Sequence, residues 1–374
     1  MSDEQALPPP PSPPIAGAAV AHLALPDGKL FTFPETADQH HVHGGDRAGY
    51  VAACDGWLLF DDEEFDVLRL TSPLTGKTRL LPGLSDDGVR IRDNAIEVVD
   101  ALRRDGNTGG QSDADAEEMS VQKLVMSPDD VGLVAAVVGR EHFAKVALCT
   151  MEGFSWSLSA RDRWRWYDDM AFHDGRLYAL THTEDLVAFD VGYEDTGEPV
   201  VSRVEHVVHG DRATWLWHTR MHYLVTSLAG PLLMVTRIMP DAGMTQRFAV
   251  FVPDLASSRW VEVNRLDAGG EALYVGRLSS RAVPSLDDAD KIFLLDDTDG
   301  MSFRMERQPR SPYHAAIYDM AGRNVSELLP RQPLVDGKTP EKHARGTAGR
   351  IRGDENGLSC LLRAQNITVI VVIK

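Results

Sequence analysis

Histidines and carboxylates crowd one short stretch of the chain, DDMAFHDGRLYALTHTEDLVAF, residues 168–189, which includes His173 and His182. Imidazole and carboxylate groups together serve general acid–base catalysis and metal binding. The stretch also divides into three apolar runs separated by His-Asp-Gly and Thr-Glu-Asp, polar triplets typical of tight turns, in which Gly175 suits the positive φ of a two-residue hairpin. We therefore interpret it as three strands and assign neither histidine to a site. Side chains of the middle strand should alternate, with Leu177, Ala179 and Thr181 on one face and Tyr178 and Leu180 on the other.

Two other segments contain residue types that bind ions. QHHVHGG holds His40, His41 and His43, which could share a zinc or nickel ion, but no acid or cysteine follows at a recognisable ligand spacing. We interpret these histidines as part of a solvated loop. TSPLTGKT, residues 71–78, ends like a phosphate loop, but Thr71 stands where that loop needs a glycine, and no helix is expected after it. We interpret it as a tight turn, and we expect neither a metal nor a cofactor.

Residues for catalysis are also scattered. The sequence has no G-x-S-x-G elbow to expose a nucleophilic serine. Adjacent acids could supply acid–base chemistry, but they fall where turns and strand ends are expected. These pairs are Asp61/Asp62, Glu63/Glu64, Asp168/Asp169 and Asp296/Asp297. We therefore expect that the protein is not an enzyme.

A repeated aromatic phrase is the better candidate for a binding site. RDRWRWYDDM (161–170) and DRATWLWHTRMHY (211–223) both place Trp-x-Trp after Asp-Arg, at the entry to a strand. Tryptophan and arginine are frequent hot spots of protein interfaces, and they also pack well inside a fold, so both interpretations stay open. The candidate protein-binding residues are Trp164, Arg165, Trp166, Trp215 and Trp217.

Composition limits the class of protein. The chain has 374 residues, 43% of them hydrophobic, enough for a substantial core. Its formal net charge of -18 repels nucleic acids and anionic membranes, and no apolar run is long enough for a membrane helix. The cysteines, Cys54, Cys149 and Cys360, are widely spaced, which indicates reduced thiols. We expect a monomer of the cytoplasm, the nucleus or both, without nucleic-acid or membrane partners.

The elements that must position these residues are short strands. Residues 1–20 are rich in proline and predict a disordered leader, and polar stretches at about 103–120 and 331–347 predict flexible loops. The remainder, 21–374, predicts a single domain. Within it, a strand–turn–strand phrase recurs five times, each time after two further apolar runs. The copies are DVLRLTSPLTGKTRLLP (66–82), KVALCTMEGFSWSLS (145–159), LVAFDVGYEDTGEPVVSRVEHV (186–207), FAVFVPDLASSRWVEV (248–263) and AAIYDMAGRNVSELLP (315–330).

Four strands in each repeat indicate a β-propeller. DGKLFTFPE (27–35) is an isolated strand, while GRIRGDENGLSCLLRAQNITVIVVIK (349–374) contains strands that lack an outer partner. Pairing the two ends in one blade would remove two exposed sheet edges. The alternative is that ITVIVVI forms a loose apolar tail. We predict an all-β, kelch-like propeller of about six blades, closed by pairing of N- and C-terminal strands.

Several of these phrases, in this order, resemble a plant family: the F-box-associated KIB-type β-propellers, whose large domain is of unknown function. The resemblance spans roughly residues 20–330. It is carried by SPLTGKTRLLP, MAFHDGRLYALTHTEDLVAFDV, YLVTSLAGPLLMVTRI, FAVFVPDLASSRWVEVNRLDAGGEALYVGRLSSRAV, DKIFLLDD and IYDMAGRNVSELLP.

The resemblance implies a role in recognition. In that family an N-terminal F-box docks on the adaptor of a ubiquitin ligase, and the propeller holds the substrate. The proline-rich start of this chain does not fit an F-box, so we do not expect direct binding to the adaptor. We expect a non-catalytic scaffold for an unidentified protein partner. The alternatives are a propeller enzyme or carbohydrate-binding module with its site at the channel mouth, and a diverged copy with little function.

Overall fold

Strands form all the regular secondary structure that the computed structural model describes. It describes residues 20–24, 30–33, 50–62, 64–85, 87–99, 119–129, 132–140, 143–210, 220–239, 245–266, 270–285, 287–294, 316–327 and 368–372. No helix occurs in these ranges, and hence none with the length and hydropathy of a membrane span. The all-β prediction is confirmed.

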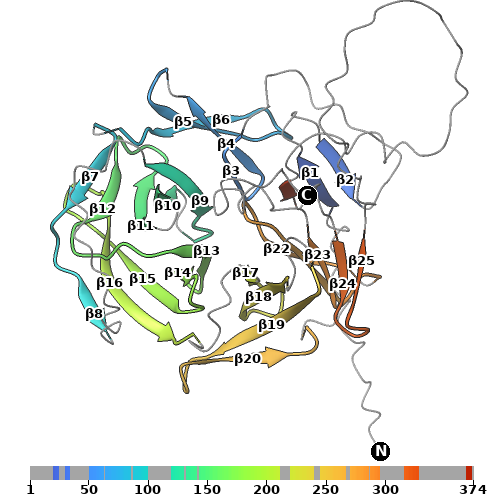
Figure 1. Ribbon diagram of the computed structural model, residues 1–374. Coiled ribbons are helices and arrows are strands. Elements are labelled where there is room, and N and C mark those ends of the chain that lie inside the picture. The colour runs from blue at the N-terminus through green and yellow to red at the C-terminus, as the bar shows by residue number, and fades with distance from the viewer. Residues whose placement is uncertain are drawn as a thin grey trace, which may run out of the picture.

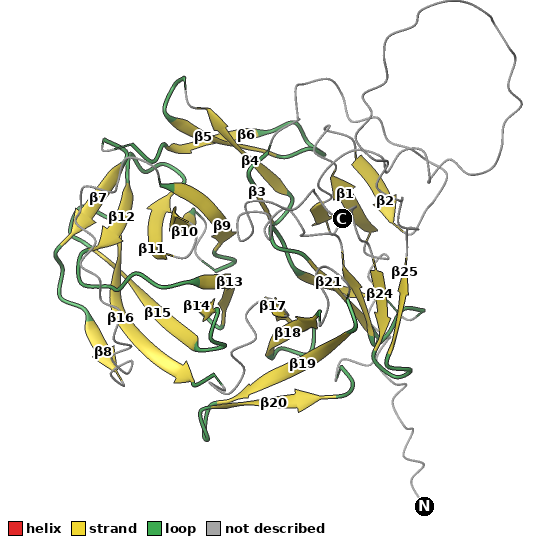
Figure 2. Ribbon diagram, in the orientation of Figure 1, coloured by secondary structure: helices red, strands yellow, loops and turns green. Residues whose placement is uncertain are grey.

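Five sheets of four or five strands are arranged as blades around a central axis (Figure 1, Figure 2). The first blade consists of β3 (Ala52–Cys54), β4 (Trp57–Asp62), β5 (Val67–Thr71) and β6 (Thr78–Pro82). The second contains β9 (Ser120–Met126), β10 (Leu133–Arg140), β11 (Phe143–Thr150) and β12 (Trp156–Ser159). The third contains β13 (Tyr167–His173), β14 (Arg176–Thr181), β15 (Leu186–Tyr193) and β16 (Pro199–Val208).

The fourth blade follows the same outward order, whereas the fifth departs from it. The fourth consists of β17 (Arg220–Thr226), β18 (Leu232–Ile238), β19 (Arg247–Asp254) and β20 (Arg259–Val263). The fifth consists of β21 (Glu271–Val275), β22 (Arg281–Pro284), β23 (Lys291–Leu294), β24 (Ala316–Asp319) and β25 (Asn324–Glu327). In this blade β21 lies between β22 and β23 and runs parallel to β23. β22 therefore pairs with β21 and not with β23, although β22 directly precedes β23 along the chain.

The segment that follows the first blade adds one outer strand to each of the next two blades. β7 (Val89–Arg92) adds to the second blade, parallel to β12, and β8 (Glu97–Val99) adds to the third, parallel to β16 (Figure 1). Between them, Asn94 Nδ2 donates to the Val201 carbonyl at 2.6 Å, and Arg92 forms ion pairs with Glu194 and Glu198. These two extra strands were not expected from the sequence.

The chain ends meet in a separate, three-stranded sheet. β1 (Val20–Ala24) pairs with β2 (Leu30–Phe33) on one side and with β26 (Thr368–Val372) on the other, so the predicted pairing of N- and C-terminal strands is confirmed. The strand expected to be isolated within 27–35 is β2, and it is corrected: it pairs with β1, and β1 makes the contact with the C-terminal strand. The blade count is corrected: the structure has five blades, not about six. The terminal sheet stays smaller than a blade because the described part of the C-terminus contributes a single strand to it.

The hydrophobic core lies between the blades, because strands of a propeller blade present apolar side chains to both neighbours. Leu177 and Ala179 of β14 pack in a cluster with the second blade, whereas Tyr178 and Leu180 pack in another cluster with the fourth. The alternation predicted for this strand is therefore confirmed. The β13–β14 turn has positive φ at Asp174 (46°) and at Gly175 (73°), as a two-residue hairpin requires.

Candidate functional site: the central channel

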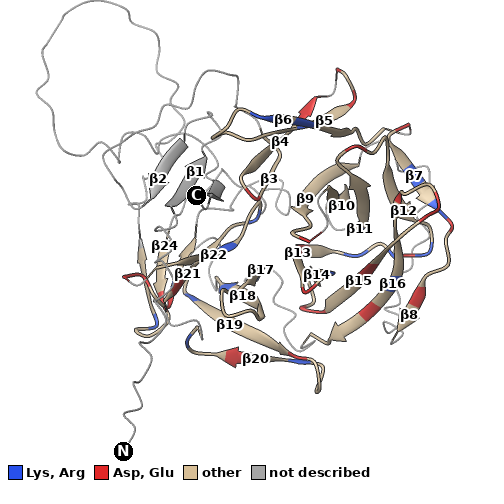
Figure 3. Cartoon of the chain, turned by 180° about the vertical axis from the view of Figure 1, so that it is seen from behind, with Lys and Arg blue, Asp and Glu red and all other residues tan. Residues whose placement is uncertain are grey.

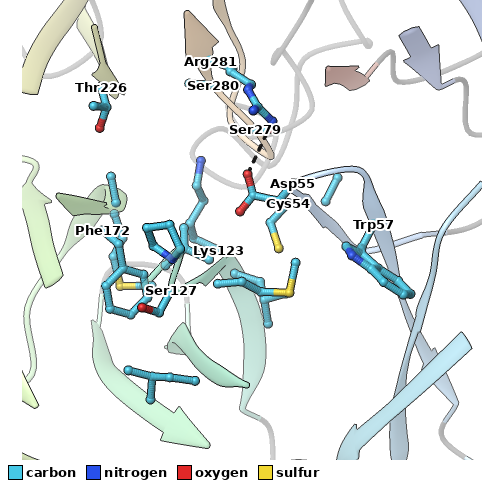
Figure 4. A pocket seen from close by; sticks show the side chains of 18 of the residues that line it. Cys54, Asp55, Trp57, Lys123, Ser127, Phe172, Thr226, Ser279, Ser280 and Arg281 are labelled. Carbon is cyan, nitrogen blue, oxygen red and sulfur yellow. Dashed lines mark ion pairs between the residues drawn. The ribbon is translucent and has the colours of Figure 1, made fainter. Parts of the chain in front are cut away.

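The inner strands of the blades surround a cavity of about 1280 Å³. β3, β9, β13, β17 and β22 contribute to its wall, together with the turns that follow β3, β9 and β17 (Figure 4). The β3–β4 turn is built on Asp55 and Gly56, both with positive φ, which is the local signature of a tight hairpin. Side chains at the C-terminal ends of four inner strands thereby converge on one opening. We call this opening, with its lining residues, the channel mouth.

Charged groups from different blades meet inside the mouth. Asp55 Oδ1 of the first blade lies 3.7 Å from Arg281 Nη1 of the fifth (Figure 4). Desolvation in the enclosing channel raises the pKa of Asp55, even though 55% of its side chain is exposed, and the charges of Arg281 and Lys123 partly offset this rise. The mouth therefore combines a carboxyl group whose pKa is raised with a neighbouring guanidinium.

A buried ion pair lies deeper in the wall. Lys123 Nζ of β9 is 2.7 Å from Asp169 Oδ1 of β13, and it also donates to the Arg277 carbonyl at 3.2 Å. Asp169 accepts further hydrogen bonds from the backbone N–H groups of Met170 and Leu224. Burial raises the pKa of Asp169, while Lys123 and these N–H groups favour its charged form. Through these contacts the pair connects the second blade (Lys123), the third (Asp169) and the fourth (Leu224).

The two cysteines in the described part of the chain are poor nucleophiles. Cys54 lies in the channel wall and Cys149 in the core, both as free, buried thiols. Burial raises the pKa of each thiol, and the nearby charge of Asp55 raises that of Cys54 further. Because the thiolate is the reactive form, neither is activated for covalent chemistry. The prediction of reduced, buried thiols is confirmed for these two residues.

The rim of the mouth is apolar and uneven. Trp57 and Phe172 contribute aromatic rings, and Met126 and Met151 contribute unbranched thioether side chains. Hydroxyl groups lie among them, from Ser127, Thr226, Ser279 and Ser280 (Figure 4). Acidic segments, by contrast, are seen on the outer strands β8, β16 and β20 (Figure 3). Although the protein has a strongly negative net charge, the mouth is lined mainly by apolar groups and hydroxyls, with three cations (Arg79, Lys123, Arg281) and two acids (Asp55, Glu152).

The structure places the predicted Trp-Arg-Trp segment at the other end of β13. Trp164 is 41% exposed, and Lys145 Nζ lies 5.0 Å from the centroid of its ring. Trp166 stacks on His182, with ring centroids 3.9 Å apart. Because this tryptophan precedes the strand and Phe172 lies near its end, the two are about 20 Å apart along β13.

Arg165 is engaged inside the fold. Its Nη1 donates to Asp162 Oδ1 at 2.6 Å and to the Tyr167 hydroxyl at 3.0 Å. The other two predicted residues, Trp215 and Trp217, lie outside the described residues. A role in binding for the predicted set remains a prediction, with Trp164 as its most exposed described member.

Other sequence candidates resolve into structural roles. TSPLTGKT forms the turn between β5 and β6, as predicted, with Gly76 at φ 69°. A register shift at the start of β13 directs the adjacent acids to different partners: Asp168 lies 3.1 Å from His182 Nδ1, while Asp169 contacts Lys123. His40, His41, His43, Glu63, Asp296, Asp297 and Cys360 lie outside the described residues.

Sequence reasoning missed the residues of the channel mouth. Asp55, Lys123 and Arg281 belong to three different blades and are 68 and 158 positions apart along the chain (123 − 55 and 281 − 123). A usable signal was present in β9, where Lys123 lies next to the apolar residues Leu124, Val125 and Met126 of an inner strand. A cation in such a position needs a buried partner, which here is Asp169.

Comparison with known proteins identifies the family. The KIB1-4 beta-propeller model matches residues 23–319. No curated protein matches the chain. A solved propeller described as that of Dos1 is 12% identical with a TM-score of 0.32, over 74% of this chain and 60% of that one. A Lactobacillus plantarum protein of known crystal structure is 10% identical with a TM-score of 0.33, over 73% and 64%. This chain thus spans less than two thirds of either one. The family match covers most of the sequence, and the chain therefore belongs to the KIB1-4 β-propeller family.

Proposed function

We propose that this propeller is a non-catalytic scaffold that recognises a protein partner, and that a segment of the partner binds at the channel mouth. The observation that carries the proposal is the composition of the rim, where Trp57, Phe172, Met126 and Met151 surround an opening that also holds Arg281. Aromatic and arginine side chains dominate the energetics of protein interfaces. Methionine adapts its shape to an apolar partner.

The size of the cavity favours a partner that inserts an extended segment over a partner that presents a flat surface. A cavity of about 1280 Å³ exceeds the roughly 300–1000 Å³ typical of small-ligand pockets. It would hold several side chains of a loop or a chain terminus. The hydroxyls of Ser127, Thr226 and Ser280 would then hydrogen bond to the backbone of that segment. Trp164, beyond the other end of β13, lies outside this proposed contact region.

The test is affinity capture of partners from plant cells by three forms of the protein, followed by mass spectrometry. The parent should retain a partner that W57A/F172A loses. W164A is the matched control, an aromatic substitution at the far end of β13 whose partner recovery should equal that of the parent. Equal recovery by W57A/F172A, with both proteins folded, would contradict binding at the mouth.

A second candidate is supported by the same cavity. A deep pocket in which aromatic rings, hydroxyls and a carboxyl group meet is also suited to a carbohydrate, either bound or processed there. Asp55, whose pKa is raised, would be the group to donate a proton or a hydrogen bond. Binding to a glycan array that is lost in D55N and W57A would favour this candidate and count against the protein scaffold.

Family membership supports a proposal for the cellular role. We infer that the chain binds the kind of target that F-box-bearing members hold, and that it competes for or scaffolds such targets in the cytoplasm or nucleus. Partners of the parent protein that also bind an F-box-bearing relative would support this inference. A set of partners with no overlap would contradict it.

A further inference from the structure

We propose that Asp185, His206 and His209 form a binding site for a divalent transition-metal ion. Asp185 lies in the turn between β14 and β15, while His206 and His209 lie at and just beyond the C-terminal end of β16. One ligand atom of each residue lies within 4.8 Å of those of the other two. This site is separate from the channel mouth, at whose wall none of the three residues lies.

The imidazole of His206 is the strongest indication. The residue is 6% exposed, and neither of its ring nitrogens makes a hydrogen bond within the described part of the protein. Its Nε2 is 3.2 Å from Asp185 Oδ1, close enough for an ionic contact but without hydrogen-bond geometry. The Nε2 of this buried ring is thus in an ion pair with Asp185, whereas Nδ1 lacks a hydrogen-bond partner among the described residues, and a metal ion bound to the imidazole would satisfy it.

The spacing of the two histidines brings their rings together. They are three residues apart, and the strand ends between them at Val208, so the chain can turn both rings to the same side. The ring centroids lie 4.0 Å apart at an angle of 64°. His206 is buried, while His209 is exposed, so one ligand is fixed and the other can adjust.

The carboxylate is already oriented by other contacts. The Gly210 N–H donates to Asp185 Oδ1 at 2.8 Å, and the Thr183 hydroxyl donates to Oδ2 at 2.8 Å. Gly210 fits closely against the turn, because a Cβ added there would lie 1.7 Å from the Thr183 carbonyl oxygen. Such outer contacts orient the ligands of known metal sites and raise their affinity.

The site also bridges two blades. The backbone N–H of His209 donates to the carbonyl of Ser258, in the β19–β20 turn of the fourth blade, at 3.1 Å. Asp185 and His206 belong to the third blade. A metal held by all three side chains would therefore fix His209, whose backbone already contacts the fourth blade, and its binding should stabilise the folded ring by mass action.

The ligand set specifies the kind of ion. Two imidazoles and one carboxylate suit Zn²⁺ and related transition metals, and are poorly suited to Ca²⁺ or Mg²⁺, which prefer oxygen ligands. Ligand atoms about 2.1 Å from a tetrahedral zinc are about 3.4 Å apart. None of the three separations exceeds 4.8 Å, and the exposed His209 ring is free of the packing that fixes His206, so it is the ligand that would move to complete the site. The exposed side leaves a position for water or for a further ligand.

The experiment is titration with ZnCl₂, and separately with CoCl₂, of a protein that carries H40A/H41A/H43A. This background removes the other histidine cluster, so that zinc binding to His40, His41 and His43 does not contribute to the signal. We expect one equivalent of zinc to bind, a melting temperature that rises with zinc concentration, and a visible Co²⁺ absorption band. H209A should lower zinc affinity by at least about tenfold, remove the band and abolish the rise in melting temperature.

Two further variants separate the site from unspecific binding. D185N should weaken zinc binding like H209A, because it replaces the charged ligand. H173A, which removes a histidine elsewhere in the third blade, should bind zinc like the background protein. The proposal is overturned if the background protein binds no zinc, or if H209A and D185N bind it with unchanged affinity.

Discussion

The carboxylate of Asp169 on β13 lies 2.7 Å from the ammonium group of Lys123 on β9, and both side chains are buried at the junction of two blades. Leu224 of the fourth blade donates its backbone N–H to the same carboxylate. The glutamate Glu271 repeats this arrangement between the fourth and fifth blades, where it accepts hydrogen bonds from Ser227 Oγ and from the backbone N–H of Leu228. Buried carboxylates thus connect neighbouring blades near the channel.

Removing one partner of the buried pair should be costly. K123M leaves Asp169 buried without its cation, and breaking such a pair typically lowers the free energy of unfolding by about 3–5 kcal/mol. The double variant K123M/D169L should lose less than the sum of the two single variants. Urea denaturation of the four proteins measures these differences. Additive losses would show that the two residues are not coupled.

An exposed ion pair serves as the control for this experiment. Arg161 Nε lies 2.8 Å from Asp93 Oδ1, but the side chains are 55% and 79% exposed. R161A should therefore change the free energy of unfolding by less than about 1 kcal/mol.

The sheet that joins the chain ends should stabilise the ring. β26 pairs with β1 over five residue pairs, from Val20↔Val372 to Ala24↔Thr368. Deleting residues 347–374 exposes the edge of β1 and should lower the melting temperature by on the order of 5 °C or more. Differential scanning calorimetry measures it, and an unchanged cooperative melt would refute closure by the termini. Deleting residues 2–14, in the proline-rich leader, should leave the melt as it is.

Acidification should destabilise the protein through His222. Burial lowers the pKa of this histidine below 6.5, although Asp168 and Glu184 oppose the shift. The unfolded chain therefore takes up a proton that the folded protein excludes. The stabilising contribution is complete above pH 6.5 and is lost as the pH falls toward the folded-state pKa, with a slope of at most about 1.4 kcal/mol per pH unit.

Unfolding free energies measured between pH 7.5 and 5 test this prediction. H222Q cannot be protonated, so its curve should be flatter than that of the parent over this range. His222 Nδ1 is paired with Thr236 Oγ1 at 3.1 Å, so T236V is a control that disturbs the same contact but keeps the titrating group. If the unfolding free energies of H222Q and the parent depend on pH with the same slope, His222 does not contribute to the acid destabilisation.

Trp156 of the second blade should stabilise the contact with the first blade. It is fully buried, and its Nε1 donates to the Pro82 carbonyl at 2.8 Å. W156F keeps most of the apolar volume but leaves that carbonyl without the indole donor, so it should lower the free energy of unfolding by about 1–3 kcal/mol. W156A also creates a cavity and should cost more. Equal stability of W156F and the parent would contradict a role for the hydrogen bond.

Much of the fold could be predicted from the sequence because blade strands are local. The strands within 168–189 follow from an apolar alternation and from the turn at Gly175, and each pairs with its neighbour along the chain. Family resemblance could be recognised for the same reason. Pairing of the chain ends followed from the cost of open sheet edges.

The features that were missed depend on pairing between distant segments. β7 and β8 join blades that begin some 30 and 70 residues later, and β21 inserts between two strands of its own blade with parallel pairing to one of them. The channel mouth is likewise assembled from several blades. His206 and His209 carry a His-x-x-His spacing that is visible in the sequence, but the carboxylate that completes the cluster lies 21 residues earlier (206 − 185). A search for metal ligands at short, fixed spacings therefore does not find Asp185.

Recognition at the channel mouth is tested most directly by hydrogen–deuterium exchange of the protein alone and in complex with the captured partner. We predict slower exchange in the complex at the turns that form the mouth, around Asp55–Trp57, Ser127 and Ser227–Gly230, with unchanged exchange in residues 161–166. Protection confined to 161–166, with the mouth turns unaffected, would contradict the account.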